Sequence, residues 1–229
     1  SNQGKKIKDL YPQSDLDIIY SNPSIEELNR MDAVFLALPK EEALAIASTL
    51  KTVVIDLSPA HRFDNKYVYG LPEVNRQKIK KTNYIANPGC YATACLLGVL
   101  PLDMTKINSI SFDCKSGYSG GGKTKKYDFE ENVAPYSLVE HYQRPEIEKF
   151  VQVPFSFTPH VVNAFRGLMA TIHIFGKTEE FEDLNKRYQS FYKDEPFVKI
   201  ANEVPDFKKV TNTDYCYIGG FSKGKGHFV

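Results

Sequence analysis

The segment that decides the fold is residues 33–57, AVFLALPKEEALAIASTLKTVVIDL. It begins with a continuous apolar run at 33–38, which is typical of a strand buried on both faces. Pro39 then opens a helical pattern rich in Ala, Leu and Glu that reaches Lys51. A second apolar run follows at 52–57. Strand, helix and strand joined by short links predict a parallel βαβ unit of an α/β fold.

The flanking sequence predicts a second domain of a different kind. Toward the amino end, residues 17–20 predict a short strand, and Ser24 with Glu27 forms a capping-box pattern before a short helix. After Asn87 we expect helices over 91–100 and 181–192. Strand-like runs fill the rest, at 107–114, 151–158, 168–175 and 215–221. Strands clustered with few helices predict an α+β domain with a mainly antiparallel sheet, which divides the chain into domains 1–89 and 90–229.

Composition excludes several classes of protein. Hydrophobic residues make up 42% of the 229 residues and charged residues 25%, which is ordinary for a globular protein. The net charge of +1 argues against a nucleic-acid partner, and no apolar run is long enough to predict a membrane span. The four cysteines form no C-x-x-C pair and have no histidines at zinc-ligand spacing. We therefore expect no metal site, and free thiols in a reducing cytoplasm.

The clearest chemical signal is IANPGCYATA at residues 85–94. A strand ends there, Pro88-Gly89 turns the chain, and Cys90 lies where a helix begins. A thiolate at that position faces free backbone N–H groups and the positive end of the helix dipole, which favours a nucleophile. On position alone, a buried structural cysteine fits equally well.

A nucleophilic thiol needs a proton partner, and His141 is the candidate among five histidines. It lies in EHYQRPEIE at residues 140–148, where Pro145 predicts the start of a helix. Arg144 and Glu146 place a guanidinium and a carboxylate near this imidazole. Taken alone, the segment fits a charged helix cap at the surface better than a catalytic site.

A glycine-rich segment, SGYSGGG at residues 116–122, is the third feature. Small residues allow a ligand to approach the backbone closely, and successive N–H groups can form an anion-binding nest. A flexible hairpin is the alternative. The spacing does not match a phosphate-binding P-loop.

Together these blocks resemble the N-acetyl-gamma-glutamyl-phosphate reductase family of arginine biosynthesis. The resemblance rests on YGLPE at 69–73 with Asn75-Arg76, the cysteine block at 85–93, SGYSG at 116–120, His141 with PEI at 145–147, FTPH at 157–160 with Arg166-Gly167, and Thr211-Asn212. These blocks follow the family order over essentially the whole chain. The resemblance implies a partial Rossmann-type NADP-binding domain followed by a catalytic and dimerisation domain.

The resemblance also implies a mechanism and a set of site residues. Cys90 attacks an acyl phosphate, a thioester forms, and NADPH reduces it to the semialdehyde. His141 assists proton transfer, Glu146 orients His141, and Asn87 binds the substrate. Arg144 is our own inference as a partner of the substrate carboxylate, because a guanidinium binds a carboxylate in a bidentate manner. The cofactor residues implied for NADP are Ser1, Lys5, Leu38, Pro39, Ser58, Ser116, Gly117, Ser119 and Gly120. The family implies a homodimer or homotetramer.

The sequence departs from the family pattern in places. The glycine fingerprint that would cradle the pyrophosphate, and a closing strand and long helix, are not among the 229 residues. The family usually has a longer insert between Phe63 and Tyr69, and a histidine where this chain has Gln143. The open alternatives are a lysine-pathway homologue, an aspartate-semialdehyde dehydrogenase, a non-catalytic dimerisation fragment and a Cys/His hydrolase.

Overall fold

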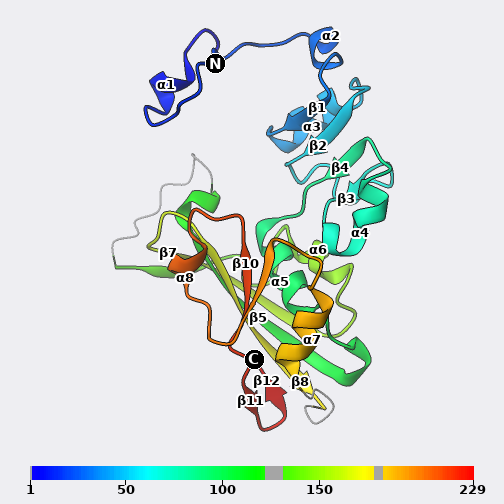
Figure 1. The fold of residues 1–229 in the computed structure, drawn as a ribbon, viewed down its shortest axis with the longest axis vertical. Coiled ribbons are helices and arrows are strands. Elements are labelled where there is room, and N and C mark those ends of the chain that lie inside the picture. The colour runs from blue at the N-terminus through cyan, green and yellow to red at the C-terminus, as the bar shows by residue number, and fades with distance from the viewer. Residues whose placement is uncertain (1, 122–130, 178–182) are drawn as a thin grey trace. The chain divides into compact units, whose positions relative to one another are not determined.

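The structure is a computed structural model that describes residues 2–121, 131–177 and 183–229 (Figure 1). The chain divides into two compact units, Ser1–Asn87 and Pro88–Val229. In the described residues no helix is both long and apolar enough to cross a bilayer, and no three His, Cys, Asp or Glu side chains cluster to hold a metal ion.

The first unit contains a parallel four-stranded sheet in the order β1-β2-β4-β3. Its strands are β1 (Ala33–Leu36), β2 (Val53–Asp56), β3 (Val68–Tyr69) and β4 (Tyr84–Ala86). Helix α3 (Lys40–Ala47) connects β1 to β2, and α4 (Pro72–Ile79) connects β3 to β4. The βαβ unit predicted from residues 33–57 is therefore confirmed.

Burial in β1 differs from the prediction. Val34 and Leu36 are buried in a cluster with Leu50 and Val54, but Phe35 is 64% exposed. Successive side chains of a strand point to opposite faces of the sheet. The apolar run therefore has one buried face here, and the expectation that both faces are buried is wrong for this strand.

The segment before β1 contains two short helices, α1 (Ile7–Leu10) and α2 (Ile25–Leu28). The predicted capping box is confirmed, because the Glu27 N–H donates to Ser24 Oγ and the Ser24 N–H donates to the Glu27 carboxylate. The strand predicted at residues 17–20 is not formed. Ile19 makes a single antiparallel bridge to Lys6 and is 58% exposed, so no ladder stabilises an extended run.

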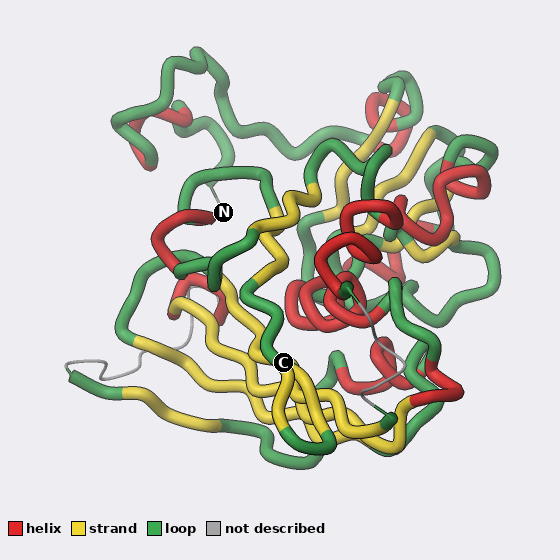
Figure 2. The backbone as a smooth tube through the Cα atoms, turned by 60° about the horizontal axis from the view of Figure 1, so that its bottom comes forward, coloured by secondary structure: helices red, strands yellow, loops and turns green. Residues whose placement is uncertain are grey.

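The second unit is built on a six-stranded sheet in the order β11-β12-β8-β5-β7-β6. Figure 2 draws strands in yellow, and several run side by side near the carboxyl end of the chain. Only the β5–β7 pair is parallel in this sheet, so its mainly antiparallel character is confirmed. The strands are β5 (Ile107–Gly117), β6 (Val133–Pro135), β7 (Phe155–Val162), β8 (Leu168–Gly176), β11 (Lys223–Gly224) and β12 (His227–Phe228). The strand predicted at 151–158 begins later, because Pro154 precedes it and lacks a ladder N–H.

A small parallel sheet of β9 (Val198–Ala201) and β10 (Cys216–Gly219) completes the strands. The run predicted at 215–221 contributes β10 to this sheet rather than to the large one. The helices are α5 (Cys90–Val99), α6 (Arg144–Glu148), α7 (Leu184–Phe191) and α8 (Phe207–Val210), with 3-10 turns η1 (Met104–Lys106) and η2 (Tyr118–Gly121). Residues 181 and 182 of the predicted helix lie outside the described residues.

Helix α5 is the centre of this unit. It is almost entirely buried after its first residue and packs against β8, where Gly98 leaves room for Ile172. The last carbonyls of a helix have no partner within it. The hydroxyls of Tyr188 and Tyr192 fill that need, since they donate to Gly98 O and Leu97 O. These bonds fix α5 at its carboxyl end.

Candidate active site

Cys90 is the first residue of α5, and Gly89 is its N-cap. Its side chain is exposed, whereas Cys95 and Cys114 are fully buried in the core with sulfurs 3.6 Å apart. Burial raises the pKa of the Cys95 thiol well above its ordinary value. The position of Cys90 at a helix amino end suits a nucleophile, and its exposure does not fit a buried structural cysteine.

The amino end of α5 is capped by side chains from a distant segment. The Gly89 N–H donates to Glu146 Oε2 at 2.9 Å, and the Ala92 N–H donates to Gln143 Oε1 at 3.1 Å. Gln143 and Glu146 are each 1% exposed. Gln143 is the N-cap of α6 and Glu146 lies in its first turn. The start of α6 therefore satisfies backbone donors that a helix leaves without partners at its own start.

Gln143 also reaches the candidate nucleophile. Its Nε2 lies 3.7 Å from Cys90 Sγ and 2.8 Å from Tyr142 Oη, and it donates to both. A Cβ on Gly89 would overlap with the Gln143 side chain, so a larger residue at this N-cap must displace that side chain. The Cys90 sulfur thus receives a hydrogen bond from an amide.

His141 is 5% exposed and lies among aromatic rings. Its ring centroid is 4.6 Å from Tyr142, 5.3 Å from Phe157 and 5.6 Å from Tyr91. The Gln143 N–H donates to His141 Nδ1 at 3.2 Å, so in the neutral ring the proton lies on Nε2. The acid–base role of His141 stays a prediction.

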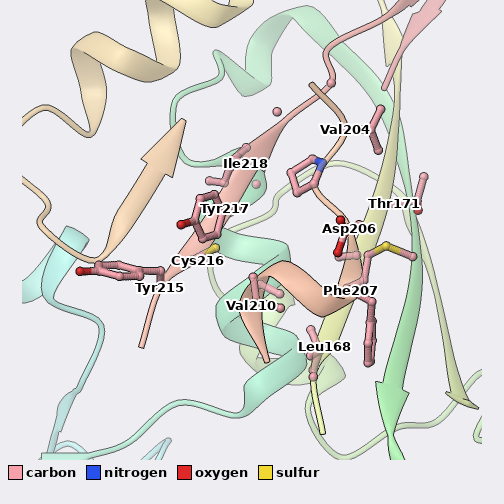
Figure 3. Close-up of a pocket in the computed structure, with 18 of the residues that line it drawn as sticks. Leu168, Thr171, Val204, Asp206, Phe207, Val210, Tyr215, Cys216, Tyr217 and Ile218 are labelled. Carbon is pink, nitrogen blue, oxygen red and sulfur yellow. The ribbon is translucent and has the colours of Figure 1, made fainter. Parts of the chain in front are cut away.

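A pocket of about 750 Å³ opens beside Cys90 within the second unit. Figure 3 shows that β8, α8 and β10 contribute side chains to it, including Leu168, Phe207 and Ile218. The lining is largely apolar, with Arg166 among its few charged residues. An apolar cavity with a few polar groups is the usual form of a small-molecule site.

The two arginines named by the sequence occupy different surroundings. Arg144 Nε lies 2.9 Å from Glu148 Oε1, and its guanidinium stacks 4.4 Å from the Phe155 ring centroid. Arg166 lines the pocket with Cys90 and lies 3.5 Å from Asn212 Oδ1. Arg144 was the predicted substrate residue, and that role stays untested. Arg166 was part of the sequence blocks but had no role assigned.

The Ser116–Gly120 segment packs against residues 164–167. The N–H groups of Gly117, Tyr118 and Ser119 donate to backbone carbonyls there, at 2.9–3.0 Å. The predicted anion-binding nest is therefore wrong for these three residues, because their donors are already used. Ser116 Oγ donates to Gly117 O, and Gly120 lies at the end of the segment. Contact of this segment with a nicotinamide stays a prediction.

Most predicted cofactor residues of the first unit follow strands. Leu38 and Pro39 come after β1, and Pro39 is the N-cap of α3. Ser58 follows β2, is 5% exposed, and its hydroxyl donates to Asp56 Oδ2 at 3.0 Å. Asn87 follows β4, and its N–H donates to the Asp56 carbonyl.

The two amino-terminal candidates are separate from these strand ends. Lys5 is exposed, with its Nζ 3.5 Å from Asn2 Oδ1. Ser1 lies outside the described residues. The cofactor roles of both stay predictions, as does the substrate role of Asn87.

A buried acid–base cluster that the sequence did not predict lies after β2. His61 Nδ1 is 2.7 Å from Asp56 Oδ2, and the His61 ring stacks on Tyr67 with centroids 4.1 Å apart. Burial, followed by the charge of Asp56, raises the pKa of Tyr67 to about 12. His61 and Tyr67 lie after β2, in a segment whose sequence has no periodic pattern, so the fold alone brings them to Asp56.

Comparison with known proteins identifies the class. The family model described as the NAD-binding domain of semialdehyde dehydrogenase matches residues 1–82, and that of the semialdehyde dehydrogenase dimerisation domain matches residues 90–229. The chain belongs to the semialdehyde dehydrogenase family.

Curated relatives narrow the similarity to one kind of enzyme. An N-acetyl-gamma-glutamyl-phosphate reductase of Methanosphaera stadtmanae is 35% identical, over 96% of this chain and 75% of that protein. The corresponding enzymes of Methanococcus maripaludis and Clostridium kluyveri are 36% and 34% identical, over 95% of this chain and 75% of each. The resemblance inferred from the sequence blocks is thus confirmed.

Solved structures support the fold. Aspartate semialdehyde dehydrogenase with NADP from Candida albicans has a TM-score of 0.71 at 14% identity, covering 97% of this chain and 80% of that one. Aspartate semialdehyde dehydrogenase II from Vibrio cholerae has a TM-score of 0.70 at 15% identity, covering 88% and 74%. At these identities the likeness shows the fold alone.

Proposed function

We propose that this chain is an NADPH-dependent reductase of arginine biosynthesis, which converts N-acetyl-gamma-glutamyl phosphate to N-acetylglutamate semialdehyde and phosphate. The observation that carries the proposal is the exposed Cys90 thiol at the start of α5, beside an apolar pocket. A thiolate is stabilised there by the helix amino end. Relatives of that name at 34–36% identity support the choice of substrate.

In the proposed reaction, the Cys90 thiolate attacks the acyl carbon. A C–S bond forms, the C–O bond to phosphate breaks, and the electron pair leaves with phosphate. When bound, a reduced nicotinamide supplies the hydride that reduces the thioester carbon. The C–S bond then breaks, and its electron pair returns to the Cys90 sulfur as the aldehyde leaves. His141 exchanges protons with the sulfur or the oxyanion, and Glu146 holds it in place.

Backbone N–H groups at the start of α5 stabilise the oxyanion intermediate in the proposed reaction. The N–H groups of Cys90 and Tyr91 lie in the first turn of α5, between the capped N–H groups of Gly89 and Ala92. Donors at a helix amino end suit the oxyanion that develops on the acyl oxygen. We assign this role to them in the proposed mechanism.

The first unit fits a dinucleotide at one edge of its sheet. Leu38 with Pro39, Ser58 and Asn87 each follow the carboxyl end of a parallel strand. Ligands of open parallel sheets bind at that edge. Asn87 keeps its proposed substrate role. The proposed cofactor residues are Leu38, Pro39 and Ser58 of this sheet, together with Ser1, Lys5, Ser116, Gly117, Ser119 and Gly120. Lys5 is the proposed partner of the 2′-phosphate that distinguishes NADP from NAD, since it is an exposed cation.

The proposal extends to domain roles and assembly. Residues 1–89 bind NADP, and residues 90–229 supply the nucleophile and join copies into a homodimer or homotetramer in the reducing cytoplasm. The match of residues 90–229 to a dimerisation domain and the four free thiols support these assignments. Light scattering on the purified protein measures the assembly, and a monomer at micromolar concentration contradicts it.

The test uses the reverse reaction, since it avoids an unstable acyl phosphate. We expect phosphate-dependent reduction of NADP⁺ with N-acetylglutamate semialdehyde, followed at the absorbance of NADPH. Cys90→Ser should abolish it without loss of folded structure, and Cys114→Ser, in the core and not among the residues that line the pocket, serves as the matched control. Equal or faster turnover of aspartate semialdehyde contradicts the substrate. Turnover without nucleotide indicates a hydrolase, and retained activity of Cys90→Ser contradicts the covalent mechanism.

A further inference from the structure

The amide of Gln143 is used at both of its ends. Its Oε1 accepts from the Ala92 N–H at 3.1 Å, and its Nε2 donates to Tyr142 Oη at 2.8 Å and toward Cys90 Sγ at 3.7 Å. The side chain is 1% exposed. It is therefore held in one place by partners on two segments of the chain.

This network determines which end of the amide faces the sulfur. An amide oxygen and nitrogen are distinguished by the partners that they meet. The Ala92 N–H is a donor and cannot pair with the amide NH₂, so Oε1 must face Ala92. The NH₂ group must then face Cys90. The sulfur consequently receives a donor that the fold fixes in direction.

Gly89 makes the approach possible. Its φ of −68° and ψ of 148° suit any residue, so no conformational need for glycine exists there. A Cβ would, however, overlap with the Gln143 side chain. The glycine thus allows the amide to lie directly against the first turn of α5.

We infer that Gln143 is a positioning residue for Cys90, whose side-chain N–H stabilises the thiolate and fixes its direction. An amide neither gains nor loses a proton in the physiological range, so its donor is the same at every working pH. The amide also cannot accept the thiol proton, which must pass to another group. The inference deepens the proposed function but concerns the reactivity of one thiol, which can be measured without turnover.

The first test measures alkylation of Cys90 by iodoacetamide from pH 6 to 9, with peptide mass spectrometry to separate the four cysteines. Gln143→Glu keeps an oxygen for the Ala92 N–H but replaces the donor with a like charge. We expect alkylation at pH 7 to slow about tenfold or more, as expected for a lost bond to a charged group. Gln152→Glu is the matched control, because Gln152 is exposed and its substitution adds the same charge away from Cys90. An unchanged rate in Gln143→Glu overturns the inference.

A second variant tests the pH dependence. Gln143→His places a titratable ring beside the sulfur, so the alkylation profile should gain a second titration step near neutral pH that the parent profile lacks. A purely structural role for Gln143 predicts a lower melting temperature and an unchanged profile shape. An unchanged shape in a folded Gln143→His protein therefore contradicts the inference.

A measurement on the parent protein keeps the inference testable if the variants do not fold. One glutamine side-chain amide resonance in a ¹⁵N-labelled sample should shift as Cys90 ionises, and should lose that response in Cys90→Ser. The absence of any such resonance overturns the inference. Loss of reductase activity with this coupling intact would instead contradict only the proposed function.

Discussion

Gly89→Ala directly tests the packing of Gln143 against the start of α5, next to the candidate nucleophile. The backbone angles of Gly89 suit alanine, which by itself favours folding by about 0.4–1 kcal/mol. The new Cβ must displace the Gln143 side chain, because the two would overlap. The Ala92 N–H then loses its partner, at about 1–3 kcal/mol, and the forced repacking costs about 1–3 kcal/mol more. The net expected loss is about 1–5 kcal/mol.

Native-state hydrogen exchange on peptides from α5 measures this loss without signal from the other unit. The decisive comparison is the same substitution in a Gln143→Ala background, where the obstructing side chain is gone. There Gly89→Ala should be neutral or slightly stabilising, so the double-mutant cycle should show strong coupling. An equal loss in both backgrounds would refute the steric argument.

Three further predictions concern other parts of the molecule. Arg144→Gln should raise the KM of the semialdehyde substrate about tenfold with little change in kcat, because the substrate carboxylate loses its proposed charged partner. An unchanged KM in Arg144→Gln with a raised KM in Arg166→Gln would instead assign the carboxylate to Arg166, which lines the pocket beside Cys90. Tyr188→Phe should destabilise the second unit by about 1–3 kcal/mol in urea unfolding, since the buried Gly98 carbonyl loses its donor. The pKa of Tyr67 is raised to about 12 in the folded chain, so its contribution to the free energy of unfolding is complete below about pH 10 and is lost as the pH rises from 10 to 12. Tyr67→Phe should lessen this loss of stability at alkaline pH, which circular dichroism measures.

The sequence predicted those features that depend on neighbouring residues. The apolar runs flanking α3 predicted parallel strands, and Pro88-Gly89 predicted a helix starting at Cys90, because periodicity and turn chemistry act locally. The strand predicted at 17–20 does not form, because strand formation depends on a partner strand that local sequence does not show. A strand is stable only when a neighbour completes its ladder, and Ile19 has a single bridge.

The candidate site was harder to predict, because its contacts join distant segments. Gln143 and Cys90 are 53 residues apart, and no local pattern indicates that an amide will reach the sulfur. Sequence reasoning noted Gln143 only as a departure from the family. The anion-binding nest predicted for the glycine-rich segment was wrong for a related reason. The carbonyls that accept its N–H groups come from residues 164–167, which are distant in the sequence.

The capping of α5 from α6 has a consequence for the newly made chain. Cys90 is synthesised 53 residues before Gln143. Gly89 is synthesised 57 residues before Glu146, which provides the other cap. At about 5–20 residues per second, several seconds separate the synthesis of the thiol from that of its caps. During that interval the thiol is an ordinary cysteine in an unfinished helix. The hydrogen bonds of Gln143 and Glu146 to the start of α5 can therefore form only after the following segment has been synthesised and has folded onto this helix.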